Sequence, residues 1–188
     1  MRFRFFTLSA ILFITTSSSN AETIRGYARN GDVAGIAAAL DAGVDVNDYD
    51  GFGSPLTIAV RKGHYSAAKL LIERGANVNI PTKYYGDPVM IAAAQSRADL
   101  VELLLEHGAI PDSTLNGEPV LHVAAMMGCF SCVRALVEAG ADVNWEFKRE
   151  CLIRSALGTA TILKYNDIAA YLKAHGATKV TWVMSGRL

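Results

Sequence analysis

Two cysteines with Cys-x-x-Cys spacing, Cys129 and Cys132, are the residues of this sequence best suited to chemistry. They lie at the expected start of a helix, where the helix N-terminus lowers the pKa of a thiol and makes it reactive. In an oxidising compartment the same pair can form a structural disulfide instead. As a third possibility, the two cysteines are free thiols that serve only as small buried apolar side chains. Cys151, in an expected loop, is an odd third thiol.

The four histidines do not have the spacing of a metal site. They fall in four different copies of a repeat described below, so we expect no ligand cluster from them. They are His64, His107, His122 and His175. The sequence also holds no Gly-rich phosphate loop after a strand, no His-Glu-x-x-His and no Gly-x-Ser-x-Gly motif. We therefore expect no cofactor and no enzyme, apart from the redox role that the cysteine pair leaves open.

The stretch 117–144 is the element that must position the cysteine pair. An apolar run over 120–125 indicates a short buried helix, and Gly128 ends it. Apolar residues within 133–137 follow with helical spacing, and Gly140 lies where a helix needs a left-handed C-terminal residue. Helix, glycine turn, helix and glycine cap form one unit that cannot bury its apolar faces alone, so further copies are expected.

Five copies of this unit follow one another. Aligned on the glycine that ends the second helix, they are spaced by 32, 33, 32 and 36 residues, at Gly43, Gly75, Gly108, Gly140 and Gly176. Twelve residues before each glycine lies the inter-helix turn, at Gly31, Gly63, Ser96, Gly128 and Lys164. The second helices end alike, as AALDAG, LLIERG, LLLEHG, ALVEAG and YLKAHG. A period near 33 residues is typical of a stacked helical repeat protein.

The repeat resembles that of the ankyrin family. The family's Thr-Pro-Leu-His motif at the start of the first helix has recognisable counterparts in this chain. They are Ser54-Pro55-Leu56-Thr57, Asp87-Pro88-Val89-Met90, Pro119-Val120-Leu121-His122 and the weaker Ser155-Ala156-Leu157-Gly158. The resemblance covers about residues 22–178. It implies an all-α ankyrin-repeat solenoid of about five helix-turn-helix repeats with finger loops, in which the terminal repeats act as caps.

The repeats divide the chain into successive segments, which we place at residues 22–50, 51–83, 84–116, 117–147 and 148–178. The first helix is expected over Glu22–Asn30, with polar residues that suit a cap. Ser96 replaces the turn glycine of the third repeat, so we expect a strained or differently shaped turn there. For the tail, 179–188, we favour packing over the last helix pair, and a partner-binding strand is the alternative.

Residues 1–21 have the pattern of a secretory signal peptide. Arg2 and Arg4 precede an apolar stretch over 5–14, and small residues follow, so we expect cleavage after Ala21. An uncut membrane anchor is the alternative, but the apolar stretch is shorter than the roughly 20 residues that a span needs. We therefore expect a small exported bacterial protein, periplasmic or secreted, with no stable membrane insertion after cleavage.

Composition favours one folded domain and argues against nucleic acid as the partner. Beyond the predicted signal peptide the chain has 16 Lys and Arg against 18 Asp and Glu, a net charge of −2. This balance provides no electrostatic attraction for nucleic acid. The length suits a single domain, which we expect to be monomeric when no partner is bound.

The ankyrin resemblance implies that partners bind the concave face, formed by the finger loops and the exposed sides of the first helices. The fingers of this chain are rich in aromatic residues rimmed by charge, a composition typical of binding hot spots. The residue pairs before the inter-helix turns run from basic to apolar along the chain. The residues expected to bind a protein partner are Tyr49, Phe52, Arg61, Lys62, Tyr84, Tyr85, Met126, Met127, Trp145 and Phe147.

The leading functional hypothesis is a non-enzymatic protein-binding module in the periplasm, with an inhibitor, immunity or helper role. The alternative is a redox or oxidative-stress helper that uses Cys129 and Cys132. The pair lies inside an ankyrin unit and not in the βαβ context of thiol–disulfide enzymes, and Cys132 holds a position that is normally a buried Val. We therefore favour small buried thiols over a disulfide, and a disulfide over a redox enzyme.

Overall fold

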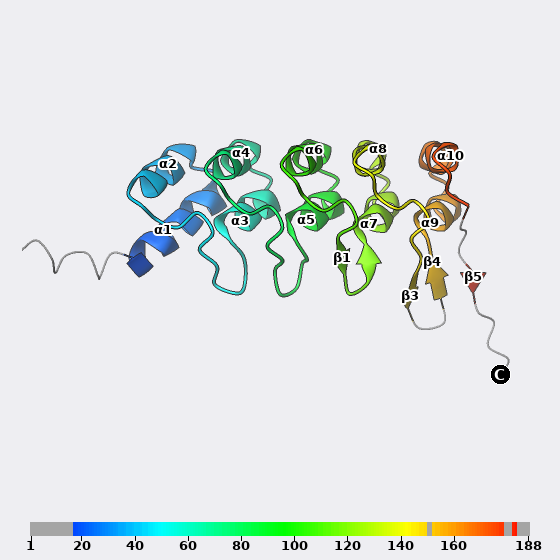
Figure 1. Ribbon diagram of the computed structural model, residues 1–188, viewed down its shortest axis with the longest axis horizontal. Helices are drawn as coiled ribbons and strands as arrows, with labels where there is room; N and C mark the ends of the chain where they lie inside the picture. Colours follow the sequence, from blue (N-terminus) through cyan, green and yellow to red (C-terminus); the bar gives the residue numbers. More distant parts are fainter. Residues whose placement is uncertain (1–16, 150–151, 179–181, 184–188) are drawn as a thin grey trace, which may run out of the picture.

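Five helix pairs stack side by side in one row in the computed structural model, which describes residues 17–149, 152–178 and 182–183 (Figure 1). The first helices of the pairs form one layer: α1 (Ser17–Asn30), α3 (Pro55–Lys62), α5 (Pro88–Ala94), α7 (Val120–Met126) and α9 (Ala156–Ile162). The second helices form the other: α2 (Val33–Asp41), α4 (Tyr65–Glu73), α6 (Ala98–Glu106), α8 (Phe130–Glu138) and α10 (Asn166–Ala174). The expected helical solenoid is confirmed.

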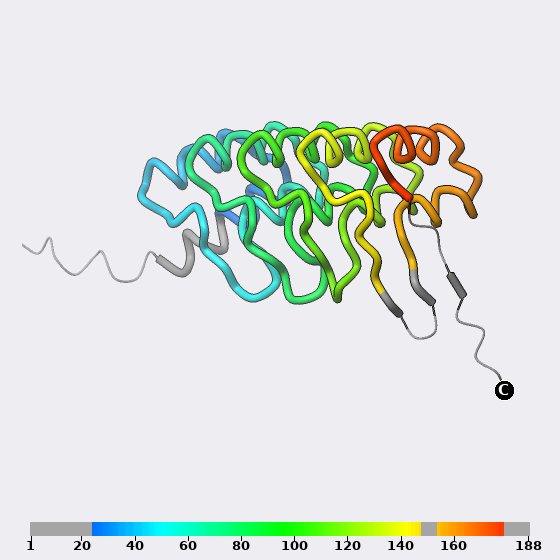
Figure 2. Tube along the Cα trace, turned by 45° about the vertical axis from the view of Figure 1, so that its right-hand side comes forward, coloured from blue at the N-terminus to red at the C-terminus, as the bar shows by residue number. Residues whose placement is uncertain are grey.

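The connections between successive pairs project away from the second-helix layer as fingers (Figures 1 and 2). Two of them contain short strands, which are β1 (Thr114–Leu115), β2 (Glu118–Pro119), β3 (Phe147–Arg149) and β4 (Leu152–Arg154). The third finger turns at Asn116-Gly117, where both residues have positive φ, as a two-residue hairpin with the favoured twist requires. β3 and β4 pair antiparallel in the fourth finger, with Phe147 opposite Arg154.

Residues 182–183 of the tail form β5 (Trp182–Val183), which pairs antiparallel with β4. This contact joins the tail to the fourth finger, whereas we expected the tail to cover the last helix pair. At the other end of the chain, α1 starts at Ser17 and not at Glu22. Its first residues are therefore part of the predicted signal peptide, whose residues 1–16 lie outside the described part of the chain.

A band of small and branched apolar side chains between the two helix layers forms one continuous core along the row. Its largest fully buried members recur at equivalent places of the repeats: Ile24, Ile36, Leu56, Leu71, Leu100, Leu104, Leu136, Leu157, Ile168 and Leu172. Each repeat thus buries its apolar face against its neighbours, as a solenoid must. Within the described residues, no helix has the length and apolar character needed to cross a bilayer.

The inter-helix turns all use a left-handed residue, and three of them are covered by a large side chain of the next repeat. A Cβ on Gly63 would lie 2.5 Å from Nη1 of Arg97, and one on Gly128 would lie 2.8 Å from Cζ of Tyr165. Ser96 keeps the left-handed geometry with φ 56°, so the turn is strained as expected but not reshaped. By its place in the repeat, Cys129 is the residue that corresponds to Arg97 and Tyr165 and covers the turn at Ser96. Its side chain is smaller than theirs.

Side-chain caps fix where the first helices begin. Ser54, Asp87 and Ser155 each accept a hydrogen bond from the backbone N–H three residues later. Proline follows the first two caps at a position where its missing N–H does no harm. Pro119 takes the cap position of α7 without a side-chain bond. The motif that identified the repeats is therefore a helix-starting device, and it sets the angle at which each finger meets its helix.

Candidate functional site

Exposed aromatic side chains are concentrated on three of the fingers. Phe52 is 65% exposed in the first finger, Tyr84 58% in the second, and Tyr49, Tyr85 and Trp145 are exposed as well. These are five of the six aromatic residues that the sequence predicted for a partner-binding surface. Burial of such rings against a partner provides a large contact area at low entropic cost.

The first finger is held in place by charges and backbone bonds. Asp50 accepts hydrogen bonds from the N–H groups of Phe52 and Gly53, at 2.9 and 3.2 Å. Partial burial by itself would raise the pKa of Asp50, but these bonds and the charge of Arg25 outweigh it and lower the pKa. Arg25 also pairs with Asp48 and is largely buried, so it supports the finger and is not a solvated cap residue.

Tyr49 links the first finger to the second. Its hydroxyl lies 3.1 Å from the carbonyl oxygen of Pro81 and 3.2 Å from that of Gly51, and it donates to one of them at a time. One edge of the ring therefore has a partner within the protein, while the rest of the side chain remains exposed. A binding partner would contact Tyr49 without having to reposition it.

The second finger presents two neighbouring tyrosines beside basic groups. A bridge between Thr82 and Gly86 closes the loop. Nζ of Lys83 lies 5.3 Å from the ring centroid of Tyr84, and the guanidinium of Arg61 lies 5.7 Å from that of Tyr85. Because Arg61 comes from α3, this second contact joins the finger to the first-helix layer. Finger and helix here form one continuous basic and aromatic surface.

The ends of the first helices continue this surface toward the C-terminus and become apolar. Lys62 is exposed at the end of α3, and Met127 is 41% exposed after α7. Met126 is half-buried, so it provides less surface than the sequence suggested. Ile162, the last residue of α9, and Leu163, which follows it, are exposed and extend the apolar end. The sequence showed this last pair as part of the trend, but they were not among the expected binding residues.

Phe147 does not belong to the exposed surface. It was expected as a partner contact, but it is 6% exposed and packs edge-on against His122, with ring centroids 4.6 Å apart. The physical reason is the β3–β4 hairpin, which the sequence analysis did not anticipate and which turns this side chain toward the helices. Trp145, two residues earlier, is exposed as expected.

His122 is fully buried and hydrogen-bonded on both ring nitrogens. Nδ1 lies 2.8 Å from Oε1 of Glu118, and Nε2 lies 2.7 Å from Oγ1 of Thr159. Burial lowers the pKa of His122, with Arg154 acting in the same direction, and outweighs the opposite effect of Glu118. The neutral ring then donates from Nδ1 and accepts from the threonine hydroxyl. This histidine ties α7 and α9 to the root of the fourth finger.

The remaining histidines also bond to backbone carbonyls of the protein. The acceptors are Arg29 for His64, Leu103 for His107 and Tyr171 for His175, at 3.1, 2.8 and 2.9 Å. In the part of the chain that the structure describes, no three His, Cys, Asp or Glu residues come together as a metal site would need.

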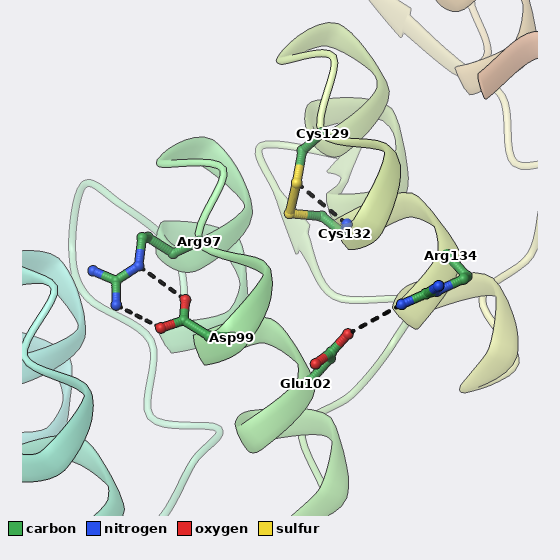
Figure 3. Close-up of a disulfide and its surroundings, with 6 residues drawn as sticks. All are labelled: Arg97, Asp99, Glu102, Cys129, Cys132 and Arg134. Atoms are coloured by element: carbon green, nitrogen blue, oxygen red, sulfur yellow. Dashed lines mark hydrogen bonds and ion pairs between the residues drawn. A yellow bond between two sulfur atoms is a disulfide. The ribbon is translucent and has the colours of Figure 1, made fainter. Parts of the chain in front are cut away.

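Cys129 and Cys132 are joined by a disulfide at the start of α8, whereas the sequence analysis favoured free thiols (Figure 3). Cys132 is fully buried, at the kind of apolar position expected for it. Its backbone N–H donates to Sγ of Cys129 at 3.2 Å, which caps the helix. Cys129 itself is half-buried and is therefore the more exposed residue of the pair. Cys151 lies outside the described residues.

Charged pairs surround the disulfide on the second-helix layer (Figure 3). Arg97 binds Asp99 through two hydrogen bonds of 2.9 and 2.6 Å, and this raises the pKa of the guanidinium and lowers that of the carboxyl. Arg134 of α8 lies 3.7 Å from Glu102 of α6. Only the second pair connects neighbouring repeats, and exposed pairs of this kind contribute little to stability.

Comparison with known proteins identifies the repeat. Two family models of ankyrin repeats match residues 89–181 and 40–89. The Ankyrin repeat and KH domain-containing protein mask-1 of Caenorhabditis elegans is 33% identical over 133 residues, 68% of this chain and 5% of that protein. The B-cell lymphoma 3 protein homolog of Mus musculus is 36% identical over 101 residues, 53% of this chain and 22% of that protein.

A plant relative matches over a greater part of the chain. The E3 ubiquitin-protein ligase KEG of Arabidopsis thaliana is 28% identical over 171 residues, 88% of this chain and 10% of that protein. The chain thus spans a small part of the length of each of these relatives. What they share with it is the repeat.

Proposed function

Because the chain belongs to the ankyrin-repeat family, we propose that it is a non-enzymatic module that binds a protein partner in the periplasm through its fingers and concave face. Ankyrin repeats are protein–protein interaction modules, and this coarse function follows from the family. The compartment is inferred from the predicted signal peptide over 1–21. An inhibitor, an immunity protein and a helper of another protein all use such a module.

The observation that carries the proposal is the set of five exposed aromatic side chains on fingers one, two and four. Loops that only connect helices are commonly polar, and the contacts of Tyr49, Tyr84 and Tyr85 within the chain leave much of each ring exposed. Against a partner, each ring removes a large apolar area from water while losing few side-chain rotations. The aromatic fingers are therefore best explained as a contact surface.

The side chains of this surface also define the kind of partner that fits it. Its first half is basic, with Arg61 beside Tyr85 and Lys83 beside Tyr84. Its second half is apolar, with Met127 followed by Ile162 and Leu163 at the equivalent place of the next repeat. We expect a partner that presents acidic groups to the first two repeats and apolar groups to the last two, since opposite charges speed and orient association.

Alanine at Trp145, Tyr84 and Tyr85 tests the proposal. We expect the triple variant to lose several kcal/mol of binding free energy, because contact aromatics each contribute about 2 kcal/mol or more. The measurement is capture of a partner from periplasmic extract, followed by titration of the captured protein against both chains. Tyr65→Ala is the matched control, because Tyr65 is an exposed aromatic that begins α4 in the second-helix layer. Equal affinity of the triple variant and the parent protein would contradict the proposal.

The disulfide favours one further candidate function, a redox or oxidative-stress helper. Its half-buried Cys129 lies at a helix N-terminus, where a thiol released by reduction is stabilised as thiolate. Replacement of Cys132 by Ser distinguishes the two functions. A pure binding module keeps its partner affinity in this variant, and a redox helper loses its protective effect against oxidants while partner binding remains.

A further inference from the structure

Three sulfur-bearing side chains lie within six residues at the junction of α7 and α8. Met127 follows the end of α7, Gly128 forms the left-handed turn, and Cys129 and Cys132 begin α8. The proposed binding surface uses Met127 only as an apolar side chain and does not use the cysteines. In the order Met-x-Cys-x-x-Cys, one thioether residue precedes the two cysteines by two positions across the turn that leads into α8.

These sulfurs have the chemistry of a ligand set for a soft metal ion. Thiolates and thioethers select Cu(I), Zn²⁺ and iron–sulfur clusters, but a structural Zn²⁺ site takes four N, S or O ligands and an iron–sulfur cluster four cysteines. In the described part of the chain, no cluster of three His, Cys, Asp or Glu residues exists that could complete a zinc site. Two thiolates and one thioether are sufficient for Cu(I), which accepts low coordination numbers.

The position of the cysteines suits an ion held between them. Their Cα atoms are 5.3 Å apart on the first turn of one helix, so both sulfurs can reach one ion once the S–S bond is broken. Cys129 is half-buried and Met127 is 41% exposed, which leaves the site open to a donor of the ion. The complex of Cu(I) with two thiolates carries one negative charge, and the positive end of the α8 dipole stabilises it.

At this junction a small residue holds the position that covers the turn of the preceding repeat. In the second, third and fifth repeats the residue at the position of Cys129 is a large side chain that covers the turn glycine of the preceding repeat, as Arg97 does over Gly63. Ser96 already carries a Cβ at the turn below Cys129, and a small residue covers it. A cysteine thus stands where other repeats have a bulky side chain that covers the turn. The junction differs from its counterparts at the place where the proposed ligands lie.

We propose that the reduced chain binds one Cu(I) ion through Cys129, Cys132 and Met127, and that the disulfide is the closed form of this site. A dithiol reductant opens it: the protein disulfide gains two electrons and two protons, and the dithiol becomes a disulfide. Cu(I) then leaves its donor and displaces both thiol protons, which are released to water, and it forms two Cu–S bonds to the thiolates and a third to the thioether of Met127, which loses no proton. Because two protons leave, the apparent affinity rises with pH until the thiols are ionised.

Competition for Cu(I) against the coloured chelator bicinchoninate, without oxygen, tests the proposal on the full chain. The parent for this test carries Cys151→Ser, so that a third thiol does not contribute, and is reduced with a dithiol that is then removed. We expect one Cu(I) per chain. Cys129→Ser and Cys132→Ser are each expected to weaken binding by about 100-fold or more, since each removes one of two thiolates.

Two methionine variants test the third ligand. Met127→Leu is expected to weaken Cu(I) binding by about tenfold, and Met126→Leu, at the half-buried neighbour, is the matched control with unchanged affinity. Circular dichroism of every variant checks that the helices are intact, and Cys129→Ser, at the more accessible position, retains the buried Cys132 in the core. X-ray absorption at the copper edge is expected to show sulfur ligands alone.

Three results would overturn the copper site: equal Cu(I) uptake by Cys129→Ser and its parent, nitrogen or oxygen ligands at the copper, or Zn²⁺ binding as tight as Cu(I) binding. Equal affinity of Met127→Leu and Met126→Leu would overturn the role of the thioether. None of these outcomes depends on the protein partner, so this proposal and the binding proposal stand or fall separately.

Discussion

The second and fourth fingers, residues 79–87 and 142–155, both carry aromatic side chains but use them in opposite ways. In the second finger Tyr84 and Tyr85 remain exposed beside basic groups. In the fourth, Phe147 is buried against His122 and only Trp145 remains exposed. One finger offers its rings to a partner, and the other uses a ring to hold itself to the helices.

The backbone explains this difference. The second finger is closed by a single bridge between Thr82 and Gly86, and its tip contacts the first-helix layer through Arg61, which lies over the ring of Tyr85. The fourth finger is a paired hairpin, in which alternate side chains point to opposite faces. Phe147 occupies the face toward α7. An aromatic residue in a finger is therefore a binding candidate only if its backbone does not turn it toward the helices.

Phe147→Ala should give the largest effect among the changes that test this comparison. Removal of a buried Phe ring typically costs 3–5 kcal/mol, so we expect about 3 kcal/mol less free energy of unfolding, measured by urea denaturation followed by circular dichroism. Tyr84→Ala is the matched change in the second finger and should stay within about 0.5 kcal/mol, because its ring is exposed. Similar losses for both variants would refute the division into a packed and a free finger.

The pH dependence of stability tests the buried histidine beneath the fourth finger. Burial lowers the pKa of His122 in the folded chain, so below the ordinary histidine pKa of about 6.5 the unfolded chain binds the proton more readily. Stability should therefore be complete above that pH and should fall as the pH decreases through this window. His122→Gln is expected to cost about 1–3 kcal/mol at pH 7, because the bonds to Glu118 and Thr159 are disturbed.

The same variant should flatten the pH profile between pH 7 and 5. Urea midpoints at half-unit steps measure the slope, and His175→Gln serves as the control, because His175 is exposed and bonds only to its own helix. If His122→Gln and the parent protein lose stability in parallel over this range, the pKa of His122 does not differ between the folded and unfolded chains, and Glu118 offsets the effect of burial.

The sequence was sufficient to predict the repeat, but it was not sufficient to predict which fingers expose their aromatic side chains and which pack them. The period of the glycines gave the helix pairs because each glycine marks a left-handed cap that few other residues can adopt at low cost. Ser96 and Lys164 occupy the same backbone conformation, so the position within the repeat overrides the residue type there. Such local constraints recur with the period of the repeat, so they can be recognised from the sequence alone.

Contacts between distant residues were not visible in this way. The bond of Arg25 to Asp48, and the packing of Phe147 on His122, join segments whose spacing follows no period. One missed signal was available, because Asn116-Gly117 is a typical hairpin turn and indicated strands in the third finger. For the fourth finger the extra length was noted, but only pairing of β3 with β4 determines which side chain turns inward.

Asp112→Asn should give the smallest effect and extends the comparison to the roots of the fingers. Below the second finger, Asn47 accepts a hydrogen bond from the N–H of Asn77 at 2.7 Å and donates to the carbonyl of Gly75 at 3.4 Å. Below the fourth, Asp112 accepts from Asp142 at 2.8 Å, but a carboxylate has no N–H to donate.

The asparagine variant gives the root of the fourth finger an N–H donor for the carbonyl of Gly140. Gly140 holds the same position in its repeat as Gly75 does below the second finger. We expect about 0.5–1 kcal/mol of added stability as a higher urea midpoint, both from the new bond and from removal of a negative charge beside Asp142. Asn79→Asp is the reciprocal control and should lose a similar amount, since Asn79 donates to Gly108 at 2.9 Å. A lower midpoint for Asp112→Asn would mean that the charge itself holds the root of the fourth finger.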